Sequence, residues 1–432
     1  MEINIGLLGA GVVGSAVASV LLEGKEDLGR KIGGAVRLKK ILVRESERQR
    51  SFQAPPGVLV TDFREVLNDP DIQIVVELMG GEEPAARYIE RLLVAGKHVV
   101  TANKEVIAKH GPELSARARS TERQLSFEAS VGAGIPIISP LSRDLLANDI
   151  RSIRAIVNGT TNYIVTRMAM DHMAFDDALL EAQHLGFAEA DPTNDIAGTD
   201  AAYKLAILAS LAFHTKVVPE DVFREGISSL EAQDFRYSQE LGFAIKLLAI
   251  AHKENGSLQL RVHPALVPQD HILASIDGAF NAIEVEGDLM GRVLFHGMGA
   301  GSESTASAVI GDVIEIARRL NLDIKPLPME ENSRSIAIAP MSELVSRYYF
   351  RLNVADRAGV LASIAKVLGD RGISIASVIQ KDADLPTQTA DLVVTTHPSR
   401  EDAVQESIRC MGELDVVRKV SNMVRIEDWP SR

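Results

Sequence analysis

Two charged residues lie one helical turn apart on an apolar segment of the sequence. The segment from Thr199 to Phe213 is apolar at nearly every position, which predicts a helix, and Asp200 and Lys204 are the exceptions. Residues four apart share one face of a helix. Because a buried ion pair is costly, keeping one suggests a function, and a desolvated lysine has a lowered pKa that suits proton exchange near neutrality. A purely structural pair at the helix start is the alternative.

Carboxylates cluster immediately before this segment. The stretch 186–195 carries Glu189, Asp191 and Asp195. Oxygen ligands of this kind could bind a substrate ammonium group or a metal ion, or they could cap the helix or stay solvated.

A second lysine directly follows a predicted strand. Lys104 comes just after the apolar segment His98–Thr101. Ligands of open α/β sheets bind at the carboxyl ends of the strands, so this lysine would lie beside a bound ligand. If that ligand is the dinucleotide predicted from the glycine-rich turn described next, the lysine would lie near its nicotinamide ring. An ordinary solvated lysine is the alternative.

A glycine-rich turn near the N-terminus predicts a dinucleotide site. It lies between a predicted strand, 3–8, and a predicted helix, 12–22, and fits the pattern G-x-G-x-x-G. Gly9 would permit the tight turn, Gly11 the approach of a pyrophosphate to the helix N-terminus, and Gly14 close packing of helix and strand. A structural turn is the alternative. The whole motif is Gly9, Ala10, Gly11, Val12, Val13 and Gly14.

The residue after the second predicted strand, 36–43, bears on the choice of cofactor. NAD sites usually place an acid here to hold the ribose 2′-hydroxyl, whereas arginine suits the 2′-phosphate of NADP. Arg44 occupies this position and predicts NADP, while the neighbouring Glu45 keeps NAD possible. A solvated loop charge is the alternative.

The elements that must position these residues indicate an α/β protein in three parts. Alternating strands and helices indicate a parallel Rossmann-type sheet over residues 1–136, with strands at 3–8, 36–43, 72–78, 98–101 and 124–129 and a helix at 88–95. Residues 137–320 indicate a mixed α+β domain for substrate binding and dimerisation, with helices at 176–185, 199–213 and 239–252 and strands at 258–267 and 280–286. Its last helix, 305–320, is expected to return to the first domain.

A proline-containing linker and a small module complete the chain. The stretch 321–346 holds Pro326, Pro328 and Pro340 and reads as a linker. Residues 347–427 show a ferredoxin-like βαββαβ pattern. Its predicted elements are 348–354, 360–371, 373–380, a turn at 382–386, 390–395, 400–411 and 416–425.

Composition excludes several classes of function. The 432 residues predict two or three domains, and a net charge of −13 argues against a nucleic-acid partner. The single cysteine, Cys410, cannot form an internal disulfide or a zinc or iron–sulfur cluster, and it lies far in sequence from the lysine motifs, so no catalytic thiol is expected. Without a basic secretory n-region or a long apolar stretch, no membrane partner and a cytoplasmic location are expected.

Four segments together resemble homoserine dehydrogenase. They are 9–14, Thr101-Ala102-Asn103-Lys104, Asn158-Gly159-Thr160-Thr161-Asn162 and 186–204, and the resemblance extends over about residues 3–425. It implies reversible NAD(P)H-dependent reduction of L-aspartate 4-semialdehyde to L-homoserine, on the route to threonine and methionine, by direct hydride transfer. A homodimer or homotetramer is implied as well.

The resemblance also implies a role for each matching residue. Lys204 would protonate the forming alkoxide, and Lys104 would assist beside the cofactor. A monovalent cation, usually sodium, would be held by a carboxylate and main-chain carbonyls of Glu128, Val131, Ala133 and Ile135. Cofactor contacts would come from 9–14, Arg44, Thr101, Lys104 and Gly301. Gly301 ends the loop 297–301, in which Met298 replaces the family's frequent proline. Substrate contacts would come from Glu189, Asp195, Asp200, Asn158, Gly159 and Thr160.

The tail resembles an ACT domain, a small regulatory module that binds amino acids. The matching stretches are 353–361 and 372–375, with Ala358 in place of the usual proline. Gly359 at a helix start would admit a ligand carboxylate to free N–H groups. The resemblance implies feedback inhibition by threonine across paired modules, and a dimerisation module without ligand is the alternative. The regulatory residues would be Asp356, Ala358, Gly359 and Val360.

Two rival functions remain open on the sequence alone. Another NADP-dependent two-domain oxidoreductase would also carry a lysine after a Rossmann strand, but it would lack the segment 189–204. A non-catalytic nucleotide-sensing regulator would have no use for two lysines at one pocket.

Overall fold

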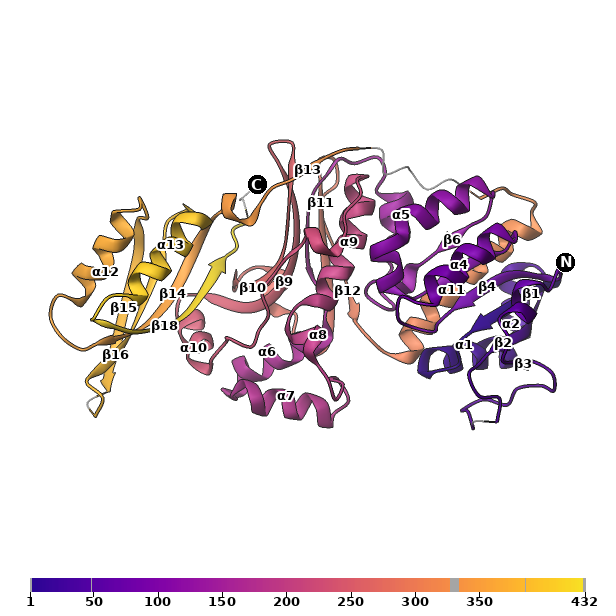
Figure 1. Ribbon diagram of the computed structural model, residues 1–432, viewed down its shortest axis with the longest axis horizontal. Coiled ribbons are helices and arrows are strands. Elements are labelled where there is room, and N and C mark those ends of the chain that lie inside the picture. The colour runs from indigo at the N-terminus through magenta and orange to yellow at the C-terminus, as the bar shows by residue number, and fades with distance from the viewer. Residues whose placement is uncertain (1, 48, 327–333, 385, 430–432) are drawn as a thin grey trace. The chain divides into compact units, whose positions relative to one another are not determined.

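The computed structural model describes residues 2–47, 49–326, 334–384 and 386–429, which fall into two compact units (Figure 1). Unit 1 contains the described residues up to 153, together with 203–221 and 281–336. Unit 2 contains 154–202, 222–280 and the described residues from 337 onward. The domain boundaries predicted at 136, 320 and 346 stay predictions.

A parallel six-stranded sheet forms the centre of unit 1. Its order is β3-β2-β1-β4-β5-β6, so the direction of winding reverses between β1 and β4, where ligands of such sheets bind. The central strands β1 and β4 are buried on both faces over most of their length, as a sheet covered on both sides requires. The Rossmann-type sheet is thereby confirmed. The strands are β1 Glu2–Leu8, β2 Ala35–Leu42, β3 Leu59–Val60, β4 Ile72–Glu77, β5 His98–Thr101 and β6 Leu125–Ser126.

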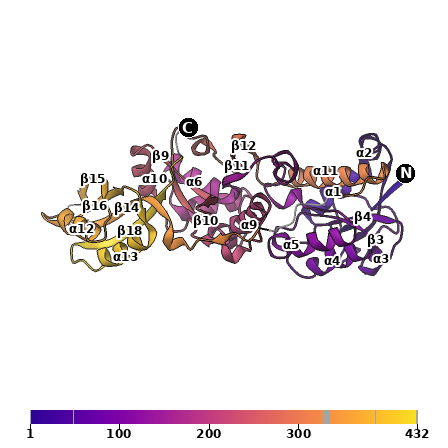
Figure 2. The ribbon, with the colours of Figure 1, turned by 90° about the horizontal axis from the view of Figure 1, so that it is seen from above.

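A helix from late in the chain completes the core of unit 1. Helix α11 (Ser302–Asn321) buries Val309, Val313 and Ile316 in the same hydrophobic cluster as Val17 of α1, and Figure 2 shows the two helices side by side. The other helices of unit 1 are α1 Val12–Glu23, α2 Lys25–Ile32, α3 Arg64–Leu67, α4 Ala85–Val94 and α5 Lys104–Ser120. Strand β12 (Gly291–Met298) precedes α11 and was missed by the sequence analysis, which placed a turn from 297 onward.

The module at the end of unit 2 has the predicted ferredoxin-like βαββαβ pattern. Its four strands lie in the order β18-β14-β16-β15, and helices α12 (Val360–Gly369) and α13 (Glu401–Gly412) contribute to its core. Within unit 2 this sheet continues through β10 and β9, because Ala265 and Leu266 of β10 pair with β18. The strands are β9 Phe243–Glu254, β10 Ser257–Pro268, β14 Val345–Ala355, β15 Ile375–Asp384, β16 Thr389–Thr396 and β18 Val417–Ile426.

Parts of the predicted linker and turn lie outside the described residues. This applies to 327–333, which includes Pro328, and to residue 385 in the predicted turn. A short strand within the predicted linker, β13 (Ala337–Ile338), pairs with β10.

The helix predicted at 239–252 is wrong. Helix α10 ends at Glu240, and Phe243–Glu254 forms strand β9, paired along its whole length with β10. The strand is buried on both faces, so its apolar run lacks the alternation that separates strand from helix. The overlooked signal was Asn255-Gly256, whose φ values of +50° and +80° form the two-residue turn between the strands.

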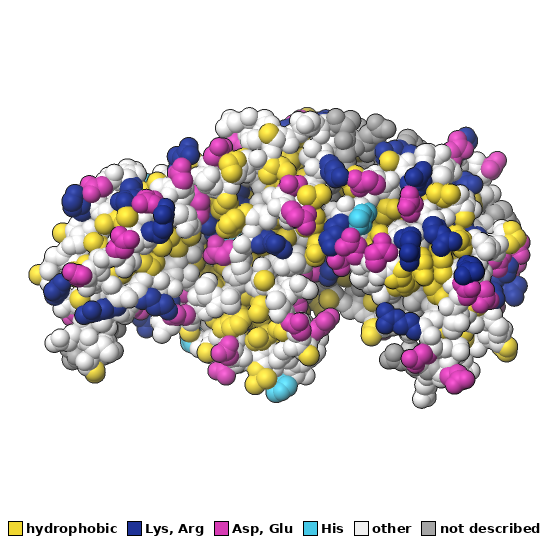
Figure 3. Space-filling view, in the orientation of Figure 1, with side chains coloured by type: hydrophobic (Ala, Val, Ile, Leu, Met, Phe, Trp, Pro, Cys, Tyr) yellow, Lys and Arg dark blue, Asp and Glu magenta, His cyan; other side chains and the backbone are white. Residues whose placement is uncertain are grey.

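The remaining elements of unit 2 carry an exposed apolar surface. Met170 of α6 (Gly159–Asp171), Leu180 of α7 (Phe175–His184) and Leu185 are exposed, and Figure 3 shows hydrophobic side chains gathered over these helices. Helix α9 (Thr199–Phe213) matches its predicted bounds, with the part from Tyr203 onward belonging to unit 1. Among the described residues, no helix has both the length and the apolar composition needed to cross a membrane.

Buried charges join the ferredoxin-like module to the rest of unit 2. Arg425 of β18 is 1% exposed and donates to Glu401 of α13 and to Glu225 just after β8 (Phe223–Arg224), with Nη1 2.8 Å from the Glu225 carboxylate. Arg351 of β14 donates to Asp234 of α10 at 2.7 Å. Both arginines are therefore neutralised inside the unit.

Candidate active site

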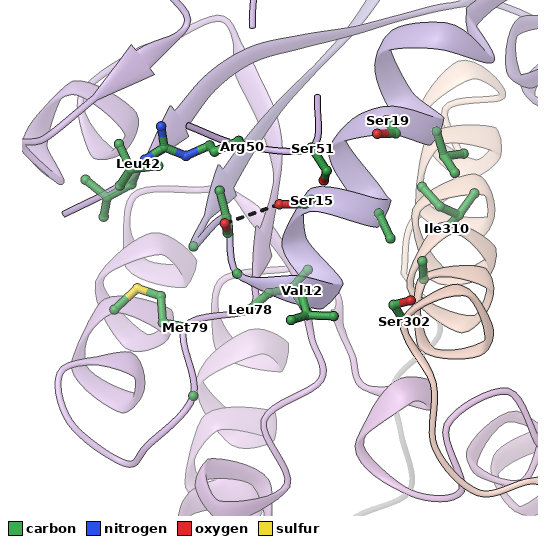
Figure 4. Close-up of a pocket in the computed structure, with 18 of the residues that line it drawn as sticks. Val12, Ser15, Ser19, Leu42, Arg50, Ser51, Leu78, Met79, Ser302 and Ile310 are labelled. Carbon is green, nitrogen blue, oxygen red and sulfur yellow. Dashed lines mark hydrogen bonds between the residues drawn. The ribbon is translucent and has the colours of Figure 1, made fainter. Parts of the chain in front are cut away.

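A large cleft opens in unit 1 at the carboxyl ends of β1, β2 and β4 (Figure 4). Its volume of about 1640 Å³ exceeds that of pockets for drug-sized ligands, as an extended dinucleotide requires. Figure 4 shows Val12 at the start of α1, with Leu78 and Met79 on one side and Ser302 and Ile310 of α11 on the other. All its lining residues belong to unit 1.

The three motif glycines differ in what surrounds them. Gly9 has a φ of +93°, and a Cβ there would lie 2.7 Å from the Leu78 carbonyl oxygen. A Cβ at Gly14 would lie 2.3 Å from the Gly9 carbonyl oxygen. At Gly11 no protein atom lies within 4 Å of a Cβ position, and this residue lines the cleft. Packing therefore requires glycine at 9 and 14, whereas the open space at Gly11 favours the dinucleotide interpretation over a purely structural turn.

The other predicted cofactor residues of the N-terminal part are only partly brought together. Ala10, Val12 and Arg44 line the cleft, and Val12 is 79% exposed. Val13 packs against the hydrophobic core and is not among the lining residues. Arg50 also lines the cleft and donates to the main-chain carbonyls of Glu45 and Ser46. Arg50 was missed because a long loop leaves no spacing pattern to read.

Gly301 is the N-cap of α11, one residue before the cleft wall. Its φ of +137° favours glycine, and Ser302 and Glu303 after it line the cleft.

Lys104 begins α5 directly behind a buried hydrogen-bond network. Asn103 caps this helix by accepting from the Val106 N–H at 3.2 Å. The Thr101 hydroxyl donates to Glu77 at 2.6 Å and accepts from the Asn103 N–H at 3.0 Å. Thr101 thus lies behind the cleft wall and is not among its lining residues. The network fixes the turn from which Lys104 extends.

Glu77 is a site residue that the sequence analysis missed. It is the last residue of β4 and 0% exposed. Burial raises the pKa of its carboxyl, while hydrogen bonds donated by Thr101, Met79, Asn103 and Gly80 favour the charged form. The available signal was an acid ending an otherwise apolar predicted strand.

In unit 1, the helix that begins at Lys104 contacts the part of α9 that carries Lys204. Lys109 of α5 lies over the Tyr203 ring of α9, with Nζ 5.7 Å from the ring centroid. Further along, the Lys216 Nζ lies 2.7 Å from a carboxylate oxygen of Glu113. Lys204 is 9% exposed, which fits the desolvated lysine expected from the sequence.

In unit 2, Asn158 brings together two of the predicted substrate carboxylates. Its side-chain amide donates to Asp195 at 2.7 Å and to Asp200 at 2.8 Å, and its oxygen caps α6 by accepting from the Thr161 N–H. Asp200 is buried, as its apolar helix predicts. Glu189 is exposed on the preceding loop and takes no part in these hydrogen bonds among the described residues.

The neighbours of Asn158 have positioning contacts of their own. The Thr160 hydroxyl donates to the Phe187 carbonyl at 2.6 Å and so holds the loop that carries Glu189. A Cβ at Gly159 would lie 2.9 Å from the Ala279 carbonyl oxygen, so the close approach requires glycine.

The loop with the predicted cation residues is organised by the Glu128 carboxylate. It accepts the N–H groups of Ile137, Ile138 and Ser139 at 2.6, 2.8 and 2.8 Å. Because these bonds occupy the carboxylate, the oxygens that Glu128, Val131, Ala133 and Ile135 can offer to a cation are mainly main-chain carbonyls. Ala133 has a φ of +52°, which curls the loop. Among the described residues, no three His, Cys, Asp or Glu side chains are arranged to hold a metal ion.

The predicted regulatory residues surround the start of α12. Gly359 caps this helix with a φ of +90°, and a Cβ there would meet no atom within 4 Å. Asp356 and Ala358 are exposed, whereas Val360 is buried in the core of the module. Cys410 of α13 is half-buried, and Arg371 donates to its Sγ at 2.8 Å.

Comparison with known proteins gives matches along the whole chain. Family models match residues 9–128 (homoserine dehydrogenase, NAD binding domain), 136–314 (homoserine dehydrogenase) and 348–409 (ACT domain). A homoserine dehydrogenase of Synechocystis sp. is 43% identical over 99% of this chain and 100% of its own length. The crystal structure of a homoserine dehydrogenase from Thiobacillus denitrificans has a TM-score of 0.92 and 42% identity over 99% of both chains. A hyperthermophilic archaeal homoserine dehydrogenase in complex with NADPH has a TM-score of 0.63 and 30% identity, over 76% of this chain and 100% of that one.

Proposed function

The chain belongs to the homoserine dehydrogenase family, and from this premise we propose that it reversibly reduces L-aspartate 4-semialdehyde to L-homoserine with a nicotinamide cofactor. The observation that carries the proposal is the 43% identity to a homoserine dehydrogenase over 99% of the chain. A match of this extent includes the segment 186–204, which argues against a different two-domain oxidoreductase and against a nucleotide-sensing regulator.

The residues of the chain supply position and proton transfer for this reaction. A bound nicotinamide cofactor supplies or accepts the hydride. Lys204 donates the proton to the forming alkoxide, and the charge of Lys104 stabilises the same oxygen. Asp195 and Asp200, held by Asn158, offer carboxylates to the substrate ammonium group, as Glu189 does from its loop.

We propose that the enzyme prefers NADP to NAD. Arg44 and Arg50 both line it near the end of β2, where the ribose phosphate of NADP would be recognised. The NADPH complex of the archaeal relative is consistent with this preference. Arg44→Glu should lower kcat/KM with NADP about tenfold or more, the equivalent of about 1.4 kcal/mol, and should leave NAD turnover less affected. A wild-type enzyme that prefers NAD would contradict the assignment.

We propose a monovalent cation, of which sodium is the expected one, at the loop of Glu128. The support is the chemistry of the loop, where main-chain oxygens can surround a hard cation. Titration of sodium into enzyme dialysed against a tetraalkylammonium buffer should raise turnover or thermal stability, and no effect on either would contradict the site.

Feedback inhibition by threonine is proposed for the ACT domain. Gly359 and the exposed Asp356 mark the start of α12, where an amino-acid ligand would find free N–H groups. Threonine should inhibit the full-length enzyme at millimolar concentration, and Asp356→Ala should raise the concentration required. An enzyme insensitive to threonine would leave the module with an assembly role only.

We further propose a homodimer or homotetramer. The exposed apolar side chains of Met170, Leu180 and Leu185 form a surface of the kind that assembly covers. Light scattering coupled to gel filtration would measure the mass, and a monomer at micromolar concentration would contradict the proposal. The cytoplasmic location stays a prediction.

The central experiment is a spectrophotometric assay of homoserine oxidation with NADP and with NAD. The wild-type enzyme should turn over homoserine, and Lys204→Ala should abolish turnover without unfolding. Lys216→Ala is the matched control, because this exposed lysine pairs with Glu113 away from the helix start. Activity of Lys204→Ala at the wild-type level would remove this lysine from the mechanism, and failure of the wild type to oxidise homoserine would refute the function.

A further inference from the structure

The Glu77 carboxylate lies between the cleft wall and the turn that carries Lys104. In the parallel register, Glu77 of β4 is paired with Thr101 of β5, so both residues end their strands at the same level. One carboxylate oxygen accepts the Met79 N–H at 2.7 Å. The other accepts the Thr101 hydroxyl at 2.6 Å. The two oxygens therefore hold two different loops.

The first of these loops forms a wall of the nucleotide cleft. Leu78, Met79 and Gly80 all line it, and the Leu78 carbonyl oxygen lies against Gly9 of the glycine motif. Gly80 and Gly81 have φ values of +74° and +72°, so the loop consists of consecutive glycines in the left-handed region. A loop with so much conformational freedom needs an external anchor to keep one shape.

The second loop leads into α5. The Thr101 hydroxyl, which donates to Glu77, also accepts the Asn103 N–H at 3.0 Å. The Asn103 side chain donates back to the Gly81 carbonyl at 2.7 Å and caps the helix in which Lys104 is the first residue. The two loops are thus closed into one network with Glu77 at its centre.

An ionised carboxylate suits this position better than a neutral side chain. It accepts at both oxygens and donates nowhere, so every neighbouring N–H or O–H group must point toward it. This fixes the Thr101 hydroxyl as a donor to Glu77 and leaves its lone pairs for Asn103. A glutamine would present an NH₂ group to one of the two donors, so either the Met79 N–H would lose its acceptor or the Thr101 hydroxyl would have to turn away from residue 77.

We propose that Glu77 is a positioning residue of the dehydrogenase, which sets the cleft wall for the cofactor and the helix start for Lys104 together. This inference rests on the proposed function for its catalytic part. Its cofactor part depends only on the cleft.

The test compares Glu77→Gln with two other variants. Glu77→Gln should raise the NADPH dissociation constant and lower kcat, each about tenfold, which corresponds to about 1.4 kcal/mol. Thr101→Val removes the branch that runs from Glu77 through Thr101 to Asn103 and keeps the branch to Met79, so it should lower kcat and leave NADPH affinity near the wild-type value. Asp69→Asn is the matched control, because Asp69 accepts from Lys39 and the Asp71 N–H at the opposite end of β4. It should cost stability without changing either kinetic constant.

The readouts separate positioning from a general role in folding. NADPH affinity is measured by fluorescence titration without turnover, and kcat is measured per folded molecule with homoserine. Wild-type constants in Glu77→Gln would overturn the proposal, and if that variant does not fold, wild-type kcat in Thr101→Val would overturn the link to Lys104. If the wild type does not oxidise homoserine, the proposed function fails, while unchanged NADPH affinity in Glu77→Gln still decides against the cofactor part.

Discussion

Replacing Gly11 by alanine should weaken cofactor binding and leave the stability of the apoprotein nearly unchanged. In the structure Gly11 caps α1 with a φ of −75°, which any L residue adopts, and a Cβ there meets no atom within 4 Å. The native state can therefore accept the methyl group without strain. Alanine has less conformational freedom than glycine in the unfolded chain, which stabilises the fold by about 0.4–1 kcal/mol. At a helix N-cap, however, alanine is less favourable than glycine by a similar amount, so the free energy of unfolding should change by less than ~1 kcal/mol.

The same methyl group would occupy the cleft beside the first N–H groups of α1. A pyrophosphate displaced from this helix end loses at least one charge-assisted hydrogen bond, at about 1.5–3 kcal/mol. The NADPH dissociation constant should therefore rise roughly 10- to 150-fold. Weaker NADPH binding by a variant whose apoprotein keeps its stability would separate an effect on the cofactor site from general damage to the fold.

Thermal unfolding with and without NADPH, together with fluorescence titration of NADPH, measures both effects. The apoprotein of Gly11→Ala should melt close to the wild-type temperature, and the stabilisation by added NADPH should be largely lost. Gly14→Ala provides the contrast, because its Cβ would lie 2.3 Å from the Gly9 carbonyl oxygen and force the backbone apart at about 1–3 kcal/mol. Wild-type NADPH affinity in Gly11→Ala, or an apoprotein destabilised by clearly more than ~1 kcal/mol, would refute the reasoning.

Three further predictions concern stability and the substrate. Burial lowers the pKa of His98 from 6.5 to about 4, so the unfolded chain takes up a proton first as the pH falls. The free energy of unfolding should therefore decrease, by up to ~3 kcal/mol, between about pH 6.5 and 4. His98→Asn keeps an acceptor for the Gln124 N–H, and its melting temperature should fall less between about pH 7 and pH 5; an unchanged slope would contradict the assignment. Arg425→Met leaves buried Glu401 without its charged partner, so the free energy of unfolding, measured with denaturant, should fall by about 3–5 kcal/mol. A decrease below ~1 kcal/mol would count against a tight ion pair. Gly226→Ala would place a Cβ 2.2 Å from the Ile196 carbonyl oxygen of α8 (Thr193–Ile196), the helix that carries the predicted substrate carboxylate of Asp195. The KM for homoserine should therefore rise while the KM for NADP stays unchanged. Equal changes in both KM values would argue for general damage to the fold.

Much of the architecture followed from local patterns. Strands β1, β2, β4 and β5 and helix α9 were predicted close to their observed bounds, because apolar runs and helical spacing record which faces are buried. The two-residue strand β3 was not predicted, and β6 is shorter than the strand predicted at 124–129. Strand β9 was mistaken for a helix because it is buried on both faces, so its sequence lacks the alternation of a half-exposed strand. Its Asn255-Gly256 turn held the information, since this dipeptide fits the positive φ values of a two-residue hairpin.

By itself, the sequence determined the chemistry that is local in the chain: the glycine turn before a helix, the arginine after β2, and an aspartate and a lysine one turn apart on an apolar helix. Only the tertiary structure decided which distant residues share a network. It placed α11 along the nucleotide cleft, joined Asn158 to Asp195 and Asp200, and set Glu77 between Met79 and Thr101. The reason is that a hydrogen bond depends on distances of about 3 Å between atoms, and chain separation does not encode such distances until strands pair in a particular register.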